Sequence, residues 1–179
     1  MKQAVSRQNW MATFAKAPLA QLEHHVDSVL ESALSSGQKR PEYQFLRSPE
    51  IGLAMVRGRA GGTGQPFNLG EMTIIRCVVQ LSGTVEGIGE TEGADALQNP
   101  KSKIQNPISG FGYVAGRSHR HAELAALCDA LMQHPDWCDR VQAGVIEPLV
   151  AIAQEKRAAE AAEVESTRVN FFTMLRGES

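Results

Sequence analysis

The sequence predicts an α+β fold, in which an antiparallel sheet of about four or five strands is flanked by helices and followed by an extended C-terminal tail. Three observations support this fold class. Apolar residues recur at helical spacing towards both ends of the chain, runs rich in Ile and Val occupy the middle, and a glycine-rich segment joins two of these runs. The 179 residues suit one domain, spanning 1–179.

Two helices are expected before the sheet. Ser6 can cap a short first helix, and Pro18 restarts the chain at a position that proline favours in a first turn. The second helix ends at Gly37. Its apolar residues recur at helical spacing, at Leu19, Leu22, Val26, Val29 and Leu34.

The strands are expected in the middle of the chain. Residues 43–47 and 51–59 predict two strands separated by a turn at 48–50. Residues 72–81 give the strongest strand signal, and their apolar character on both faces predicts a central strand that is buried on both sides. Residues 110–115 predict a further strand, which leads directly into a helix.

Two more helices are expected after the sheet. Ser118 caps the first, which Pro135 ends. Its predicted buried stripe consists of Leu124, Leu127, Cys128 and Leu131. The second covers roughly 139–165 and is interrupted at Pro148, and its latter half is rich in Ala, Glu and Lys, which predicts a solvated surface.

Two segments lack this regularity. Residues 82–109 show no periodicity and are punctuated by glycine and proline, which predicts a long loop. Residues 166–179 form an apolar and aromatic tail, and such a tail must pack on its own sheet as an edge strand or against another subunit. The interface residues expected in it are Val169, Phe171, Phe172, Met174 and Arg176.

Composition excludes several functional classes. A net charge of −2 and an aromatic content of 6% argue against nucleic-acid binding, and the apolar runs are too short to span a membrane. The three cysteines, Cys77, Cys128 and Cys138, show no C-x-x-C spacing, which argues against a disulfide framework and a zinc site. The N-terminus has no apolar stretch of signal-peptide type, so we expect a cytoplasmic protein that binds no metal.

The glycine-rich segment 59–71 has two interpretations. It can be a tight chain reversal between strands, or a cradle of backbone N–H groups for a phosphate or a partner chain. It is not a Walker loop, since no Gly-Lys-Ser/Thr follows, nor a dinucleotide fingerprint, since Phe67 stands where that motif needs glycine. The residues expected to bind an anion or a partner, here and at the turn described next, are Arg59, Gly61, Gly62, Thr63, Gly64, Arg76 and Arg117.

The turn at 116–121 offers a candidate for catalysis. A strand-to-helix turn directs backbone N–H groups and the helix dipole at its ligand, and Arg117 adds a fixed cation. On the helical wheel His121 lies on the face that points to the sheet, either as a core histidine with satisfied hydrogen bonds or as a general acid or base. His119 and Glu123 are expected to form an exposed pair.

Several motifs occur in a fixed order along the chain: Arg7-Gln8-x-Trp10-Met11, Gly61-Gly62-Thr63-Gly64-x-x-Phe67-x-x-Gly70-Glu71 with Thr73 and Arg76, Gly116-Arg117-x-x-x-His121-Ala122-Glu123, and Val169-x-Phe171-Phe172-Thr173-Met174-x-Arg176-Gly177. Together they resemble the small G subunit of the bacterial carbon–phosphorus lyase core complex, which breaks down phosphonates. In that family a short polar loop follows the strand at 72–81. Here residues 86–109 intervene as an inserted loop, and His119 lies outside the family pattern.

The resemblance implies a hetero-oligomer with H, I and J subunits. The complex supports the displacement of adenine from ATP by a phosphonate, which gives ribose 1-phosphonate 5-triphosphate, as in an alpha-D-ribose 1-methylphosphonate 5-triphosphate synthase. The J subunit then carries out radical chemistry with an iron–sulfur cluster and S-adenosylmethionine. No cofactor is implied for this chain alone.

Three hypotheses about function follow. The chain can be a non-catalytic or co-catalytic accessory subunit of this transferase, whose glycine loop and tail grip a large partner. It can be a stand-alone enzyme that binds phosphate or another anion, in which Arg117 holds the anion and His121 moves a proton. It can also be a scaffold for the folding of a partner.

Overall fold

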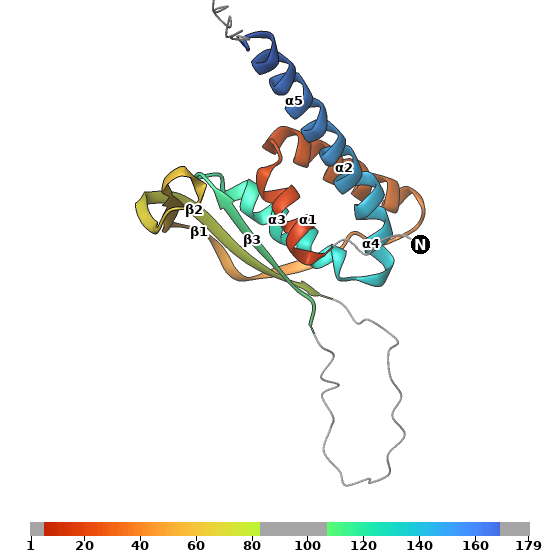
Figure 1. The fold of residues 1–179 in the computed structure, drawn as a ribbon. Coiled ribbons are helices and arrows are strands. Elements are labelled where there is room, and N and C mark those ends of the chain that lie inside the picture. Colours follow the sequence, from red (N-terminus) through yellow and green to blue (C-terminus); the bar gives the residue numbers. More distant parts are fainter. Residues whose placement is uncertain (1–5, 83–106, 169–179) are drawn as a thin grey trace, which may run out of the picture.

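The computed structural model describes residues 6–82 and 107–168, and these form a three-stranded antiparallel sheet with helices packed against one of its faces. Figure 1 shows the helices gathered on one side, the β1–β2 hairpin reaching away from them, and α5 projecting from the body. The α+β class with an antiparallel sheet flanked by helices is therefore confirmed.

The sheet consists of β1 (Glu42–Arg59), β2 (Pro66–Ser82) and β3 (Ser109–Ala115), in the order β1-β2-β3. The prediction of four or five strands was wrong for the described part of the chain, because 43–47 and 51–59 belong to one strand. Register shifts on both sides of Pro49 absorb the proline. An edge strand tolerates proline because one side of its backbone needs no ladder hydrogen bond.

The central position of β2 is confirmed, but its burial on both faces is not. Alternate residues Ile75, Cys77 and Val79 are fully buried against the helices. Their neighbours on the other face are only partly buried: Ile74, Arg76, Val78 and Gln80. The apolar run was read correctly as a strand, but no element of the described chain covers its second face.

Helix α3 (His119–Met132) lies against β3 at very short range. A Cβ atom added to Gly110 would come within 2.0 Å of the Ala126 carbonyl oxygen, and one added to Gly112 within 2.1 Å of the Ala122 carbonyl oxygen. Small residues on both elements therefore let the helix backbone touch the strand. The predicted stripe Leu124, Leu127, Cys128 and Leu131 is buried, as expected, and most of the remaining helix is buried too.

Helix α1 (Arg7–Lys16) is held to α3 and β3 by the carboxylate of Asp129, which is completely buried. Asp129 accepts hydrogen bonds from Arg7 Nε and Nη2 at 3.1 and 2.7 Å, from Trp10 Nε1 at 2.8 Å and from the Phe111 backbone N–H at 2.9 Å. The hydrogen bond with Asp129 raises the pKa of Arg7. A buried carboxylate requires such a set of donors.

The remaining helices complete the layer. Helix α2 (Leu19–Ser35) follows Pro18, and the chain after it turns at Gly37, whose φ is +84°. Helices α4 (Pro135–Val141) and α5 (Glu147–Ser166) are joined by a π-helical segment, Gln142–Ile146. The predicted interruption therefore lies at this segment and not at Pro148, which occupies the first turn of α5. No helix in the described ranges is long and apolar enough to cross a membrane.

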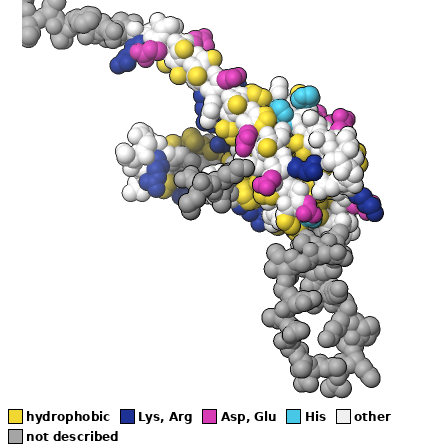
Figure 2. Space-filling view, turned by 90° about the vertical axis from the view of Figure 1, so that its right-hand side faces the viewer, with side chains coloured by type: hydrophobic (Ala, Val, Ile, Leu, Met, Phe, Trp, Pro, Cys, Tyr) yellow, Lys and Arg dark blue, Asp and Glu magenta, His cyan; other side chains and the backbone are white. Residues whose placement is uncertain are grey.

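The latter half of α5 is exposed, as its composition predicted. Figure 2 shows this helix leaving the body with basic and acidic side chains interspersed along it. Most of the expected insertion 86–109 lies outside the described residues, although Ser109 already begins β3. The five interface residues expected in the tail, 166–179, also lie outside them.

Replacing Asp129 with Asn tests the buried carboxylate. The substitution removes the charge that Arg7 pairs with and one acceptor, and we expect the free energy of unfolding to fall by about 3 kcal/mol. Urea denaturation followed by circular dichroism measures this change. Asp136→Asn, whose side chain is 69% exposed, is the matched control, with an expected change within about 0.5 kcal/mol. Equal effects of the two variants would contradict a special role for Asp129.

Adding one methyl group tests the helix–strand contact. Gly112→Ala forces a Cβ atom against the α3 backbone, and we expect it to cost at least about 2 kcal/mol of stability. In Gly52→Ala the added atom meets nothing within 4 Å, so this variant should be as stable as the native chain or slightly more so. Thermal denaturation compares the two, and a stable Gly112→Ala protein would show that α3 lies further from β3.

Candidate functional site

The strand-to-helix turn after β3 has the predicted capping geometry. The Ser118 hydroxyl accepts a hydrogen bond from the His121 backbone N–H at 3.2 Å, so Ser118 caps α3. Gly116 has a φ of +112°, which favours glycine, and its N–H donates to the Thr73 carbonyl at 3.0 Å. Arg117 is exposed between these two fixed residues.

His121 of α3 lies in the core, and its side chain contacts α1. It is 8% exposed, and its Nε2 lies 2.9 Å from the Phe14 carbonyl oxygen. Since a carbonyl can only accept, Nε2 carries the hydrogen and donates it. This nitrogen therefore ties two helices together, and the geometry favours the interpretation of a core histidine over that of a general acid or base.

Glu123 bonds to residues other than His119. It accepts a hydrogen bond from the Tyr43 hydroxyl and pairs with Arg120 at 3.3 Å, and Arg120 also pairs with Glu23 of α2. Burial, followed by the hydrogen bond to Glu123, raises the pKa of Tyr43 to about 12. The phenol therefore stays protonated near neutral pH and serves as a donor that joins β1 to α3.

The glycine-rich segment is a chain reversal between β1 and β2, as the first interpretation had it. Gly61 and Gly62 have φ values of +60° and +79°, which glycine adopts at little cost, and the Gly64 N–H donates to the Ala60 carbonyl at 2.9 Å. Arg59 turns back onto the Gly64 carbonyl, 3.4 Å away, next to the exposed Thr63. The turn uses these groups for its own structure.

The expected arginines do not converge on the loop. Arg59 lies opposite Pro66 at the tip of the hairpin, whereas Arg76 lies far along β2, opposite Glu50. A strand rises about 3.3 Å per residue, so the two arginines are separated by roughly 30 Å. Arg76 Nε donates to Glu50 Oε1 at 2.6 Å, and the same carboxylate pairs with Arg47.

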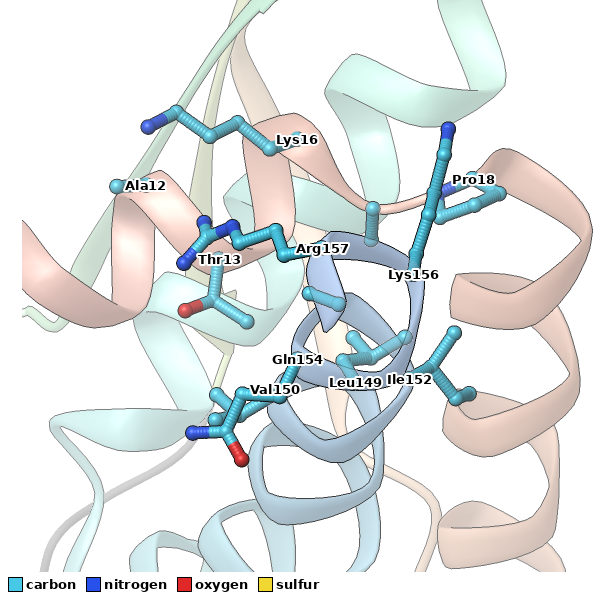
Figure 3. A pocket seen from close by; sticks show the side chains of 12 residues that line it. Ala12, Thr13, Lys16, Pro18, Leu149, Val150, Ile152, Gln154, Lys156 and Arg157 are labelled. Carbon is cyan, nitrogen blue, oxygen red and sulfur yellow. The ribbon is translucent and has the colours of Figure 1, made fainter. Parts of the chain in front are cut away.

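A pocket of about 290 Å³ lies between the end of α1 and helix α5 (Figure 3). Its wall is mainly apolar, with Leu149 and Ile152 among its residues, and three cations stand around it: Lys16, Lys156 and Arg157. Among the described residues that line it, none is an acid, a histidine or a cysteine. The cations around the pocket suit the binding of an anion.

The described ranges offer little support for a metal site or for a reactive cysteine. No group of three or more His, Cys, Asp or Glu residues there is placed to hold a metal ion. Burial raises the pKa of Cys77 to about 11 and that of Cys128 to about 12, so both thiols stay protonated at neutral pH.

The most unusual surface of the molecule is the arm, which we define as residues 51–73 of the β1–β2 hairpin. Strand β3 pairs with β2 only from Ile74 onward, so the arm is a two-stranded ribbon from the pair of Leu53 and Thr73 to its tip, and this part extends beyond the rest of the sheet. Its large apolar side chains are between 43 and 64% exposed: Ile51, Leu53, Met55, Phe67, Leu69 and Met72. Exposed apolar side chains of this kind make the arm a candidate site for interaction with another protein.

Comparison with known proteins identifies the family. The sequence profile of a family described as phosphonate metabolism protein PhnG matches residues 5–177. The chain belongs to the PhnG family. It is also 36% identical, over 175 residues, to the alpha-D-ribose 1-methylphosphonate 5-triphosphate synthase subunit PhnG of Rhizobium meliloti (strain 1021). That alignment covers 96% of this chain and 90% of the relative.

Membership of the PhnG family confirms the resemblance drawn from the ordered motifs, and the structure shows what several of them do. Arg7 and Trp10 of the first motif hold Asp129, and Gly116 begins the capped turn. Sequence reasoning missed Asp129, although an acidic residue beside the buried Cys128 was a usable signal. It also missed the exposure of the arm, because apolar periodicity does not tell which chain provides the cover.

Proposed function

We propose that this chain is an accessory subunit of a hetero-oligomeric synthase that joins a phosphonate to ribose triphosphate. In the proposed reaction a phosphonate displaces adenine from ATP and gives ribose 1-phosphonate 5-triphosphate. The observation that carries the proposal is the 36% identity, over 96% of the chain, with a relative named as a subunit of alpha-D-ribose 1-methylphosphonate 5-triphosphate synthase.

The proposed partners are the H, I and J subunits. The J subunit would hold the iron–sulfur cluster and S-adenosylmethionine for the later cleavage of the carbon–phosphorus bond. ATP is a substrate of the complex in this proposal, and this chain holds no cofactor of its own.

Two features of the structure favour an accessory role over a catalytic one. Three side chains that could act in catalysis form contacts within the chain. His121 bonds to the Phe14 carbonyl, Arg76 pairs with Glu50, and Tyr43 bonds to Glu123. The arm, in contrast, exposes six large apolar side chains. A two-stranded ribbon is marginally stable in water, so a partner that buries it would stabilise both proteins.

The alternative of a stand-alone anion-binding enzyme has less support. It needs Arg117 to hold the anion while His121 moves a proton. Arg117 is exposed, whereas His121 is buried and uses Nε2 for a hydrogen bond to the Phe14 carbonyl. No described feature brings the two side chains to one cavity.

Placing a charge on the arm tests its role in assembly. Leu69→Asp removes an apolar side chain, 62% exposed in the free chain, from the proposed interface, and burying a leucine contributes about 2 kcal/mol. We therefore expect its affinity for the co-expressed large I subunit to fall at least about tenfold. Val164→Asp, at a 70% exposed position on α5, is the matched control and should assemble normally. Analytical ultracentrifugation measures both, and undiminished assembly of Leu69→Asp would contradict a role for the arm.

The rate of adenine release by the assembled complex distinguishes the accessory role from the enzymatic alternative. A complex that contains the Arg117→Gln chain should release adenine from ATP and methylphosphonate at the native rate, because the proposal gives Arg117 no chemical step. A large loss of rate in a complex of normal mass would instead place Arg117 in the active site.

A further inference from the structure

We propose that the outer edge of β1, at residues 51–56, receives an extended strand from a partner subunit, so that the sheet of this protein continues into the partner. The partner strand would be apolar along its middle and would carry carboxylates towards the tip of the arm. This inference rests on the proposed function, since it requires that the chain is a subunit of a complex.

The other edge of the sheet is occupied in part by side chains. On β3, the Phe111 N–H donates to Asp129 Oδ2 at 2.9 Å. The Ser109 carbonyl accepts from Gln133 Nε2 at 3.0 Å and from Arg7 Nη2 at 3.4 Å. Side chains of α1, of α3 and of Gln133 after α3 thus occupy hydrogen-bonding groups that a new strand would need at Ser109 and Phe111, which disfavours strand addition at this part of β3.

The direction of the β1 backbone groups follows from one hydrogen bond. The Gly116 N–H donates to the Thr73 carbonyl, so Thr73 directs its backbone groups towards β3 and away from β1. Thr73 lies opposite Leu53. In an antiparallel pair, opposite residues either bond to each other or both point away, so the N–H and C=O of Leu53 point to the free edge.

The same alternation applies along the neighbouring residues, where the register has no shift from Glu50 to Val56. Ile51 and Met55 therefore also direct their backbone groups outward, while Gly52 and Ala54 bond to β2. Within residues 6–82 and 107–168, no backbone or side-chain group makes a hydrogen bond to the outward groups of Ile51, Leu53 or Met55.

This part of the edge lacks the usual protection against pairing. Residues 51–56 read Ile-Gly-Leu-Ala-Met-Val, with no charge and no proline. Pro49 and two register shifts lie before this segment, and a third register shift follows it between Val56 and Arg57, so the irregularities flank the segment without interrupting it. A free edge with an uncharged apolar sequence pairs with other chains, and a stable subunit needs it covered.

The side chains indicate what kind of strand fits. Ile51, Leu53 and Met55 are 50, 64 and 53% exposed, whereas Ile75, opposite Ile51 on β2, is fully buried. The helix layer covers β2 and β3 and reaches β1 at Tyr43, but it leaves Ile51, Leu53 and Met55 exposed, so an added strand with apolar side chains would continue the covered surface. Arg57 and Arg59 follow next and form none of the ion pairs found in the described chain, which favours carboxylates at that end of the partner strand.

Amide hydrogen exchange of the full chain, free and in complex with the co-expressed H, I and J subunits, tests this inference residue by residue. Exchange is quenched and read by NMR on the isolated chain. In the free chain the amides of Ile51, Leu53 and Met55 should exchange quickly, and those of Gly52 and Ala54 slowly. In the complex the three outward amides should slow by at least about a hundredfold.

The possible failures are distinguishable. Outward amides that stay fast in a complex of the expected mass would overturn strand addition and leave the subunit role intact. Outward amides that are already slow in the free chain would also overturn it, since a second copy or another part of the chain would then cover the edge. The absence of any complex would count against the proposed function itself.

A pair of substitutions separates the backbone from the side chain. Leu53→Pro removes both the side chain and the outward N–H, and edge positions tolerate proline, whereas Leu53→Ala removes the side chain alone. We expect Leu53→Pro to bind the partner subunits at least tenfold more weakly than Leu53→Ala. Equal affinities would show that the partner contacts only side chains and would overturn the proposed strand addition.

Discussion

The buried carboxylate of Asp129 is the interaction on which the arrangement of this molecule depends. Asp129 belongs to α3 and accepts hydrogen bonds from α1 and from β3, so the distant α1 and the neighbouring β3 are fixed to α3 around one charge. Removing a charge from water is costly, and only this full set of donors makes the burial favourable. Asp129 and Arg7 also occupy outward backbone groups of β3, at Phe111 and Ser109.

With one edge partly occupied and one face covered, the molecule is asymmetric. Helix α3 can approach β3 closely because Gly110 and Gly112 leave room for its backbone. The arm is left outside the helix layer with its apolar residues in water. A free-standing enzyme has little use for such a surface, whereas a subunit of a synthase, as the relative from Rhizobium meliloti is named, gains stability when a partner covers it.

Local chemistry made much of the fold predictable from sequence. The capping of α3 by Ser118, the end of α2 before Gly37 and the reversal at Gly61 depend on a few neighbouring residues, and all three were found. The single long β1 was not predicted, because Pro49 breaks most strands and only its place at a sheet edge lets the strand continue. The contacts of Asp129 and His121 join residues more than a hundred positions apart, and no local pattern specifies which distant group will meet them.

The central claim, that this chain works as a subunit and not alone, is tested most directly by its mass in solution. Multi-angle light scattering would be recorded for the chain alone and for the chain co-expressed with the large I subunit. The account predicts a defined hetero-complex in the second sample, with a mass above that of either protein. A chain that remains a well-behaved monomer in the presence of that subunit would contradict it.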